Sequence, residues 1–363
     1  MKIIIFSIIP PLGARGLINQ KIILKNMRII VPMAGLGKRM RPHTLTTPKP
    51  LIPIAGKPIV HRLVEDIAKV CGQKIEEVAF IIHPSFGVEA EKNLILVAEK
   101  IGAKGSIFYQ TEALGTAHAI MCAKESLIGN VVVAFADTLF KADFTLDANK
   151  DGIIWVQKID NPSAFGVVKL NENQEITDFV EKPAVFVSDL AIIGIYYFKD
   201  GAYLRKNLQY LLDNKIMEKG EYQLTNALEN MKAEGAKFAI GEVHEWLDCG
   251  NKDVTVETNA RYLEFLQSAN VELVAKSAKI INSVVIAPVF LGENAIIENS
   301  VVGPHVSVGA GTKIVGSVVN NAIIQENTSI KNSNITNTML GNFVVLEDSP
   351  KEMSLGDYSN ILK

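Results

Sequence analysis

The chain has 363 residues, of which 48% are hydrophobic and 21% are charged, and its formal net charge is −2. This length is sufficient for two domains with buried cores. The near-neutral charge, without a basic run, argues against nucleic acid or an anionic membrane as the main partner. The three cysteines, Cys71, Cys122 and Cys249, lie far apart, which suits a reducing compartment and gives no metal-site spacing. No apolar run reaches the roughly 18 residues of a membrane span.

Residues 1–26 precede the first predicted strand. The apolar run Ile3–Ile9 after Lys2 resembles the start of a signal peptide, but it is short and no A-x-A cleavage site follows. Met27 stands directly before the strand. We therefore expect residues 1–26 to be a start-site artefact or a disordered leader, and not an export signal.

A glycine-rich turn follows the first apolar run, Ile29–Val31. The spacing Gly35-x-Gly37 allows a sharp turn that presents bare backbone N–H groups to an anion. Arg39 and Lys49 add a guanidinium and an ammonium, and this combination suits a nucleoside triphosphate. The stretch contains neither G-x-x-x-x-G-K-[ST] nor the third glycine of G-x-G-x-x-G. A solvated basic turn at the surface is the alternative.

Helix and strand patterns alternate after this turn. Apolar residues at helical spacing predict helices, and unbroken apolar runs predict buried strands. The predicted elements are a helix over 59–70, a strand over 78–82, a helix over 89–101, a strand over 106–109 and a strand over 131–136. This alternation predicts βαβ units in a doubly wound sheet. Ligands of such sheets bind at the carboxyl ends of the strands.

Two of the loops at those strand ends carry polar side chains. The amide of Gln110 can both donate to and accept from a base edge, and Gly115 permits close approach of a planar ligand. A helix N-terminus capped by Thr116 is the compatible alternative. Asp137 ends the next apolar strand, where its carboxylate is placed to anchor Mg²⁺ on triphosphate oxygens. An aspartate there is otherwise a turn former or a helix cap.

The next segment has an antiparallel pattern of short strands. The predicted strands cover 152–158, 165–170, 176–180 and 191–198. A helix opens within 220–228, and the stretch Trp246–Gly250 closes this part of the chain. Asp248, inside that stretch, is the second carboxylate that we expect at the metal. A helix over 251–267 then links to the last part.

The last part of the chain has a different periodicity. Aliphatic residues recur every five or six positions, and most are followed by a small or polar residue. These positions are Ile281, Ile286, Leu291, Ile297, Val302, Val308, Ile314, Val319, Ile324, Ile330, Ile335 and Leu340. This hexapeptide pattern predicts a left-handed parallel β-helix of about four coils, with the aliphatic side chains pointing inward.

Several motifs, in this order, resemble those of the sugar-phosphate nucleotidyltransferases, which are nucleoside-diphosphate-sugar pyrophosphorylases. The signature G-x-G-x-R-[ML]-x-P-x-T-x-x-x-P-K-P matches the stretch Gly35–Pro50. The other matches are Q-x4-G-x-A-x-A from Gln110, the aspartate at Asp137, F-G-V from Phe165, E-K-P from Glu181, G-E-x-x-L-T from Gly220 and W-x-D-x-G from Trp246. Ala136 and Asn226 depart from the family's usual glycine and aspartate.

The resemblance implies an α/β fold, with a Rossmann-like doubly wound nucleotidyltransferase domain followed by the left-handed β-helix. It assigns Arg39 to the departing pyrophosphate, Lys49 to the phosphates near the reacting centre and Lys182 to the sugar phosphate. Asp137 and Asp248 then hold Mg²⁺. The residues that it assigns to substrate binding are Ala34, Gly35, Gly37, Gln110, Gly115, Thr116, Gly166, Glu181 and Gly194.

The resemblance implies a cytoplasmic enzyme that converts an NTP and a sugar 1-phosphate into an NDP-sugar and pyrophosphate. We expect glucose 1-phosphate and dTTP, because the tail resembles that of long glucose-1-phosphate thymidylyltransferases and the Gln110 amide suits a pyrimidine. UTP or GTP, as in mannose-1-phosphate guanylyltransferases, is the alternative. Two further alternatives are a β-helix that transfers acyl groups with His305 as the base, and a non-catalytic regulatory protein that binds NDP-sugars.

The expected domain boundaries follow from these patterns. The catalytic domain covers 27–255, a linker helix 256–275 and the β-helix 276–345, while 346–363 form a tail lying on the helix or disordered. We expect the β-helix to support assembly into a homo-oligomer, because its flat faces are broad and self-complementary.

Overall fold

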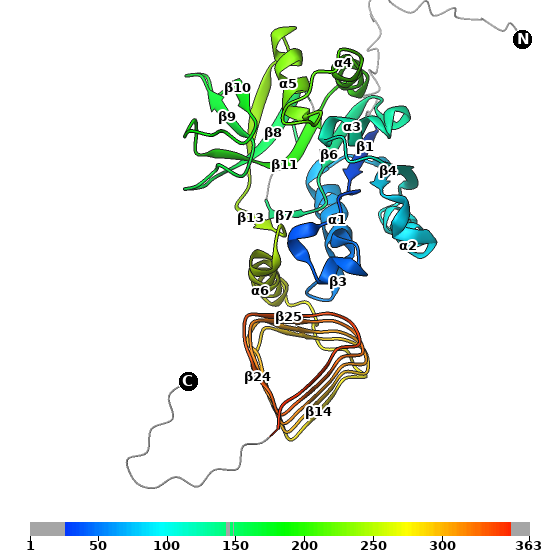
Figure 1. Cartoon of the computed structure of the whole chain (residues 1–363), viewed down its shortest axis with the longest axis vertical. Helices are drawn as coiled ribbons and strands as arrows, with labels where there is room; N and C mark the ends of the chain where they lie inside the picture. The colour runs from blue at the N-terminus through cyan, green and yellow to red at the C-terminus, as the bar shows by residue number, and fades with distance from the viewer. Residues whose placement is uncertain (1–25, 143–145, 148, 350–363) are drawn as a thin grey trace, which may run out of the picture.

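A computed structural model describes residues 26–142, 146, 147 and 149–349 of the chain, and Figure 1 shows its two-part architecture. Four parallel strands form the centre of the N-terminal sheet, in the order β6-β1-β4-β5. They are β6 (Asn130–Ala134), β1 (Met27–Pro32), β4 (Ile75–Ile82) and β5 (Lys104–Tyr109). The strand order changes direction beside β1, so the carboxyl ends of β1 and β6 flank a crevice.

Helices cover both faces of this sheet, as the βαβ alternation predicts. Alternate residues of each strand point to opposite faces, so Ile29 and Val31 pack in one core while Ile30 packs in the other. The first core contains α1 and α2, and the second contains α3, α4 and α5. The helices are α1 (Ile59–Cys71), α2 (Gly87–Lys100), α3 (Thr116–Met121), α4 (Gly201–Asp213) and α5 (Leu224–Ala233).

Antiparallel strands extend the sheet beyond β6. Strand β11 (Leu190–Phe198) pairs with β6 in antiparallel fashion, and it also contacts β8 and β9. The other strands of this extension are β8 (Gly152–Lys158), β9 (Val167–Leu170), β10 (Ile176–Val180) and β12 (Phe238–Glu242). A separate ribbon pairs β7 (Thr138–Lys141) with β13 (Glu245–Asp248).

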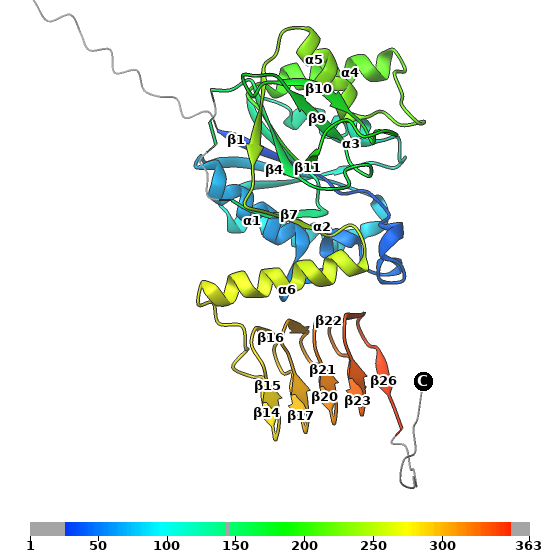
Figure 2. The same ribbon diagram turned by 90° about the vertical axis from the view of Figure 1, so that its left-hand side faces the viewer.

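Helix α6 (Lys252–Ser268) leads from this ribbon to the C-terminal part. Its first turn is capped by Asn251, whose side-chain oxygen accepts from the N–H groups of Asp253 and Val254. In Figure 2 the helix lies between the N-terminal part and the stacked strands below it. None of the helices in residues 26–349, leaving aside the undescribed 143–145 and 148, is long and apolar enough to cross a membrane.

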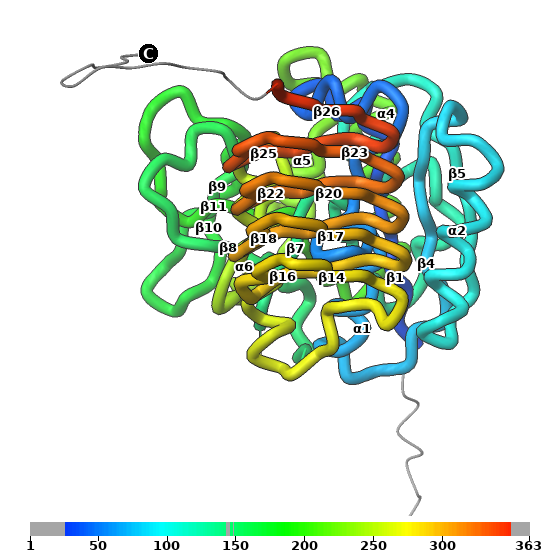
Figure 3. The backbone as a smooth tube through the Cα atoms, turned by 90° about the horizontal axis from the view of Figure 1, so that it is seen from below, coloured from blue at the N-terminus to red at the C-terminus, as the bar shows by residue number. Residues whose placement is uncertain are grey.

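The C-terminal part consists of three parallel sheets that form a triangular coil, which confirms the predicted left-handed β-helix (Figures 1 and 3). One sheet contains β14 (Lys279–Ile281), β17 (Ile296–Glu298), β20 (Lys313–Val315), β23 (Ser329–Lys331) and β26 (Val345–Glu347). A second contains β15 (Val284–Val285), β18 (Val301–Val302), β21 (Val318–Val319) and β24 (Asn334–Ile335). The third contains β16 (Val289–Leu291), β19 (Val306–Val308), β22 (Ala322–Ile324) and β25 (Thr338–Leu340).

Repeated polar residues turn the chain at one corner of the coil. Asn282 and Asn299 adopt positive φ there (46° and 50°), a conformation that asparagine tolerates better than most residues. A ladder of serines follows, in which the hydroxyl of Ser300 accepts from the N–H of Ser317, at 3.0 Å. The same contact repeats in the next coil, so each coil satisfies the corner N–H of its neighbour.

The predicted register is wrong in the first coil. The sequence predicts that Ile281 and Ile286 point inward, but the register sets Ile280 opposite the buried Ile297 and Val285 opposite the buried Val302. Exposure does not separate Ile280 from Ile281, which are 46% and 47% exposed in the end strand of their sheet. Equivalent residues lie 17 apart in the first coils and 16 apart in the later ones. A one-residue slip reverses the side of the strand that a residue faces.

Strand β26 extends two residues into the predicted tail, and residues 350–363 of that tail lie outside the described residues, as do residues 1–25.

The N-terminal part and the β-helix share a continuous core along α6. Phe290, Ile323 and Met339 point out of the third sheet of the coil and pack with the first core. A Cβ added to Gly56, in the β2–β3 hairpin (Pro53–Ile54 and Lys57–Pro58), would lie 2.1 Å from the Phe290 ring. Glycine at this position therefore lets the coil dock closely.

Asn259 connects α6 to the N-terminal part and to the β-helix through one buried side-chain oxygen. Its Oδ1 accepts from the N–H of Ala55, at 2.8 Å, and from the hydroxyl of Ser307, at 2.7 Å. We expect Asn259→Ala to lower the free energy of unfolding by about 2–4 kcal/mol, because the Ala55 N–H then stays buried without a partner. Ser307→Ala, which leaves that N–H paired, should cost only about 1 kcal/mol. Chemical denaturation of both variants tests this, and equal losses would contradict it.

Candidate active site

Two adjoining cavities form one cleft at the carboxyl ends of the central strands. The first, of about 410 Å³, lies between the glycine turn after β1, the loop after β5 and the end of β6. The second, of about 230 Å³, lies between the β9–β10 region, β11 and β13. The residues that line both cavities are Arg39, Thr116, Phe135, Asp137 and Glu221. Every residue that the sequence singles out for the site lines one cavity or both.

The glycine turn has the sharp geometry that its spacing predicts. Gly37 adopts φ 58°, and a short 3-10 helix (Lys38–Met40) follows it directly. Met40 is fully buried, so it fixes this helix on the core while Arg39 reaches the boundary of the two cavities. A Cβ at Gly35 would meet no atom within 4 Å, which leaves open space beside the turn for a ligand. Ala34 lines the same cavity.

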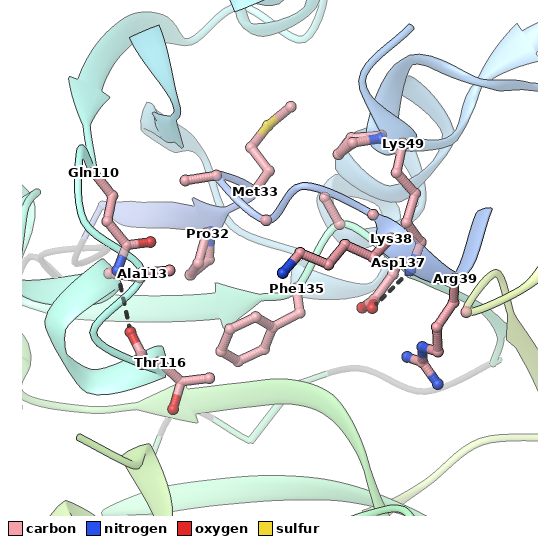
Figure 4. Close-up of a pocket in the computed structure, with 18 of the residues that line it drawn as sticks. Pro32, Met33, Lys38, Arg39, Lys49, Gln110, Ala113, Thr116, Phe135 and Asp137 are labelled. Carbon is pink, nitrogen blue, oxygen red and sulfur yellow. Dashed lines mark hydrogen bonds and ion pairs between the residues drawn. The ribbon is translucent and has the colours of Figure 1, made fainter. Parts of the chain in front are cut away.

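Lys49 and Asp137 form an ion pair at the centre of the cleft. The Lys49 Nζ lies 2.9 Å from Asp137 Oδ2, and Figure 4 shows this contact as a dashed line. Lys49 is 8% exposed, whereas the Asp137 side chain is 43% exposed. The buried ammonium therefore partly neutralises a carboxylate that still faces the cavity.

Asp248 approaches the same point through the β7–β13 ribbon. In the antiparallel register Asp248 lies opposite Thr138, the residue after Asp137. Burial and the charge of Asp137 raise the pKa of Asp248, while the Gly250 N–H donates to its Oδ1 at 2.8 Å. Two carboxylates that repel each other are suitable ligands for a divalent cation. Within the described part of the chain, no cluster of three or more His, Cys, Asp or Glu offers an all-protein metal site.

Gln110 lies at the far end of the first cavity with its amide already oriented. The Gln110 Nε2 contacts the Gly115 carbonyl at 3.3 Å and the His118 ring at 3.1 Å. Gly115 adopts φ 104°, and a Cβ there would lie 2.5 Å from the carbonyl oxygen of Tyr222. Thr116 begins α3, and its hydroxyl accepts from the Leu224 N–H at 2.9 Å. The loop therefore packs tightly and leaves Gln110 Oε1 without a donor among the described residues.

The second cavity contains the remaining predicted residues. Glu181 accepts from Thr225 at 3.4 Å and lies 3.4 Å from the Lys182 ammonium. Lys182 has φ 42°, a costly conformation for lysine that is held in part by its N–H bond to Phe165, at 3.1 Å. Gly194 adopts φ 86° at an irregularity of β11 and also lines this cavity.

Gly166 completes this side of the cleft. A Cβ at Gly166 would lie 3.1 Å from Glu181 Oε2 and 3.3 Å from Ile192 Cδ1. Any larger residue would therefore displace the Glu181 carboxylate.

Sequence reasoning assigned no role to Glu221 or Gln223, although both line the second cavity and Glu221 also lines the first. The Gln223 Oε1 accepts from the Thr116 hydroxyl at 3.4 Å, and its Nε2 donates to Glu221 at 3.0 Å. This chain links the loop after β5 to the start of α5. The G-E-x-x-L-T resemblance marked the segment, but no spacing indicates that two loops so far apart in sequence would meet.

The structure places His305 away from the cleft. Its Nε2 lies 2.9 Å from Glu264 of α6, at the contact between the β-helix and the helix. Glu264 also contacts Arg261, which binds both carboxylate oxygens of Glu245 at 2.7 Å. These contacts give His305 an architectural role, so they do not favour an acyl-transfer base at this position.

The raised pKa of Asp248 predicts a pH dependence of stability. The folded protein retains this proton to higher pH than the unfolded chain, so ionised Asp248 destabilises the fold at neutral pH. We expect Asp248→Asn to raise the melting temperature at pH 7 in a chelator. The advantage should shrink as the pH falls through the folded-state pKa toward the usual 3.8. Melting curves between about pH 4 and pH 8 test this, with the exposed Asp160→Asn as the control. Identical curves for Asp248→Asn and the unchanged protein would refute it.

Several known proteins are similar to this chain in sequence or in fold. The bifunctional protein GlmU of Methanococcus vannielii is 30% identical over 257 residues, which cover 68% of this chain but only 58% of the relative. Glucose-1-phosphate thymidylyltransferase of Streptomyces antibioticus is 26% identical over 92% of this chain and 99% of the relative. The crystal structure of a UDP-glucose pyrophosphorylase with UDP-glucose has the same fold over 66% of this chain and 99% of its own length, at a TM-score of 0.55 and 24% identity.

The family model described as nucleotidyl transferase matches residues 29–264, which include every element that lines the cleft. The chain therefore belongs to the nucleotidyl transferase family.

Proposed function

We propose that this protein transfers a nucleoside monophosphate from an NTP to a sugar 1-phosphate and releases pyrophosphate. The observation that carries the proposal is the junction of the two cavities at Arg39 and Asp137. A nucleotide in the first cavity and a sugar phosphate in the second would bring their phosphates together at this junction. Both substrates would then react without leaving the cleft.

The chemistry requires positioning and charge neutralisation more than a covalent intermediate. An oxygen of the sugar phosphate attacks the α-phosphorus of the NTP in line. A new P–O bond forms between these two atoms, and the bond from the α-phosphorus to the departing pyrophosphate breaks. We assign Arg39 to the pyrophosphate and Lys49 to phosphates near the reacting centre, and both residues line the first cavity. Lys182, across the junction, is placed to align the sugar phosphate.

Asp137 and Asp248 fit a magnesium ion that the triphosphate shares. Burial, and after it the charge of Asp137, raises the pKa of Asp248, and a cation between the two carboxylates would relieve both costs. Bound there, Mg²⁺ would neutralise phosphate charge during the transfer. Lys49, which pairs with Asp137 in this structure, would then be free to contact a phosphate.

The free oxygen of Gln110 supports a preference for one set of bases. With Nε2 directed at Gly115 and His118, Oε1 is left as the acceptor. An acceptor suits the ring N–H of thymine, uracil or guanine, whereas adenine and cytosine have a bare ring nitrogen there and offer only an exocyclic amino group. We propose dTTP with glucose 1-phosphate as the best pair, since the match to a glucose-1-phosphate thymidylyltransferase spans nearly the whole chain. UTP and GTP remain the alternatives.

The direct test is pyrophosphate release by the purified full-length protein with Mg²⁺. Five nucleotides (dTTP, UTP, GTP, CTP and ATP) are each combined with glucose, mannose and N-acetylglucosamine 1-phosphates. We expect turnover with one of dTTP, UTP or GTP and one sugar phosphate. Turnover with ATP or CTP alone would contradict the Gln110 argument. A folded protein that binds a nucleotide but never releases pyrophosphate would favour a regulatory binding protein.

Arg39→Ala isolates the role of the guanidinium. We expect turnover to fall by about 100-fold or more, as for the loss of other groups that stabilise charge in a transition state. Arg39 is exposed, so the melting temperature should stay unchanged. Arg41→Ala is the matched control, because Arg41 is an exposed arginine of the same turn that lines neither cavity. Near-normal turnover of Arg39→Ala would remove this residue from the mechanism.

A further inference from the structure

Lys38 points into the first cavity although the sequence motif assigns it no role. In Figure 4 its side chain extends from the glycine turn toward Phe135, in the space between Gln110 and the Lys49–Asp137 pair. It lines the first cavity and not the second. Its side chain is exposed, and it forms no ion pair with any residue in the described ranges.

The short 3-10 helix explains this direction. Such a helix has three residues per turn, so three consecutive side chains leave it in three directions about 120° apart. Met40 takes the direction of the core, where it is fully buried. Arg39 takes the direction of the boundary between the cavities, and Lys38 that of the first cavity alone. The backbone of Gly37, at φ 58°, sets the orientation of the whole turn.

The charges around the first cavity leave a need that Lys38 can meet. A triphosphate brings several negative charges into a cavity already lined by Asp137 and Glu221. Lys49 is engaged with Asp137 at 2.9 Å, and Arg39 serves both cavities. Lys38 is the remaining lysine or arginine among the described lining residues, and an ammonium on a flexible stem binds phosphate well as a point charge.

We infer that Lys38 is a substrate-binding residue that contacts the triphosphate of the nucleotide and does not contact the sugar phosphate. The inference rests on the proposed function, because it takes the first cavity as the nucleotide site. It separates the two neighbouring cations of the turn: Arg39 acts at the junction, and Lys38 acts on the nucleotide only. Loss of Lys38 should therefore weaken the binding of the nucleotide and not that of the sugar phosphate.

Lys38→Met tests the inference, because methionine keeps the length and loses the charge. Nucleotide binding is measured by titration calorimetry in a chelator without sugar phosphate, using whichever of dTTP, UTP, GTP, CTP and ATP binds the unchanged protein most tightly. We expect the Kd to rise about tenfold, which is the size of one charge-assisted contact. Lys38→Arg should restore binding to within about threefold, and the difference between Lys38→Met and the unchanged protein should shrink at high salt.

Steady-state kinetics provide the readout that a merely structural role would not give. The KM for the nucleotide should rise about tenfold in Lys38→Met, while the KM for the sugar 1-phosphate stays within about twofold. Lys92→Met is the control, since Lys92 is an exposed lysine of α2 that lines neither cavity and forms one ion pair among the described residues, with Glu89 at 3.9 Å. Equal rises in both KM values, or an unchanged nucleotide Kd, would overturn the inference.

The proposed reaction and the proposed Lys38 contact can be disproved separately. If the unchanged protein binds a nucleotide and Lys38→Met weakens it, but no pyrophosphate is ever released, the proposed reaction is wrong and the Lys38 contact stands. If pyrophosphate is released and Lys38→Met behaves as the unchanged protein, the contact is wrong and the reaction stands. If none of the five nucleotides binds, both are overturned.

Discussion

The antiparallel pairing of β13 with β7 is the constraint on which the site depends. Asp137 stands at the end of a parallel strand, but its partner carboxylate comes from a segment over 100 residues later. The register that sets Asp248 opposite Thr138 brings the two acids into one cleft. Burial first, and the charge of Asp137 second, raises the pKa of Asp248, so the ionised carboxylate is unfavourable at this place in the protein alone. Such a cost is expected where a site is arranged for a charged ligand rather than for stability.

Different neighbouring groups reduce the electrostatic cost of each of the two carboxylates. The buried Lys49 compensates Asp137 directly, and the Gly250 N–H supports Asp248. The charge of Arg39 lowers the pKa of Asp248, although no ion pair joins the two, and Lys38 has no ion-pair partner among the described residues. The cleft therefore combines the Lys49–Asp137 pair with positive charges that attract an anion.

Much of this arrangement was predictable from sequence, because local rules determine it. Gly35, Gly37, Gln110 and Asp137 follow strand ends, and the carboxyl ends of parallel strands converge on one edge. The hexapeptide pattern likewise specified the β-helix, since each repeat contributes one inward aliphatic residue.

Other features depend on contacts that no spacing records. Glu221 and Gln223 enter the site because one loop packs on another, and the contact of Phe290 with Gly56 joins two domains. In the first coil two aliphatic residues stand side by side, Ile280 with Ile281 and Val285 with Ile286, so spacing alone does not show which one faces inward, and this coil was assigned one residue late. These are tertiary outcomes rather than local ones.

Helix α6 sets a natural length for the β-helix beside it. The helix has 17 residues and is about 25 Å long, and it lies across the edges of successive coils (Figure 2). Coils stacked at about 4.8 Å cover that distance with about five layers, and the sheet that faces the helix has four strands, to which a bridge between Val274 and Leu291 adds a fifth layer. A shorter coil would leave part of the helix's apolar face uncovered, and a longer one would extend past its support. The number of coils thus matches the length of α6, which packs against both domains. A change in the length of this helix should be accompanied by a change in the number of coils.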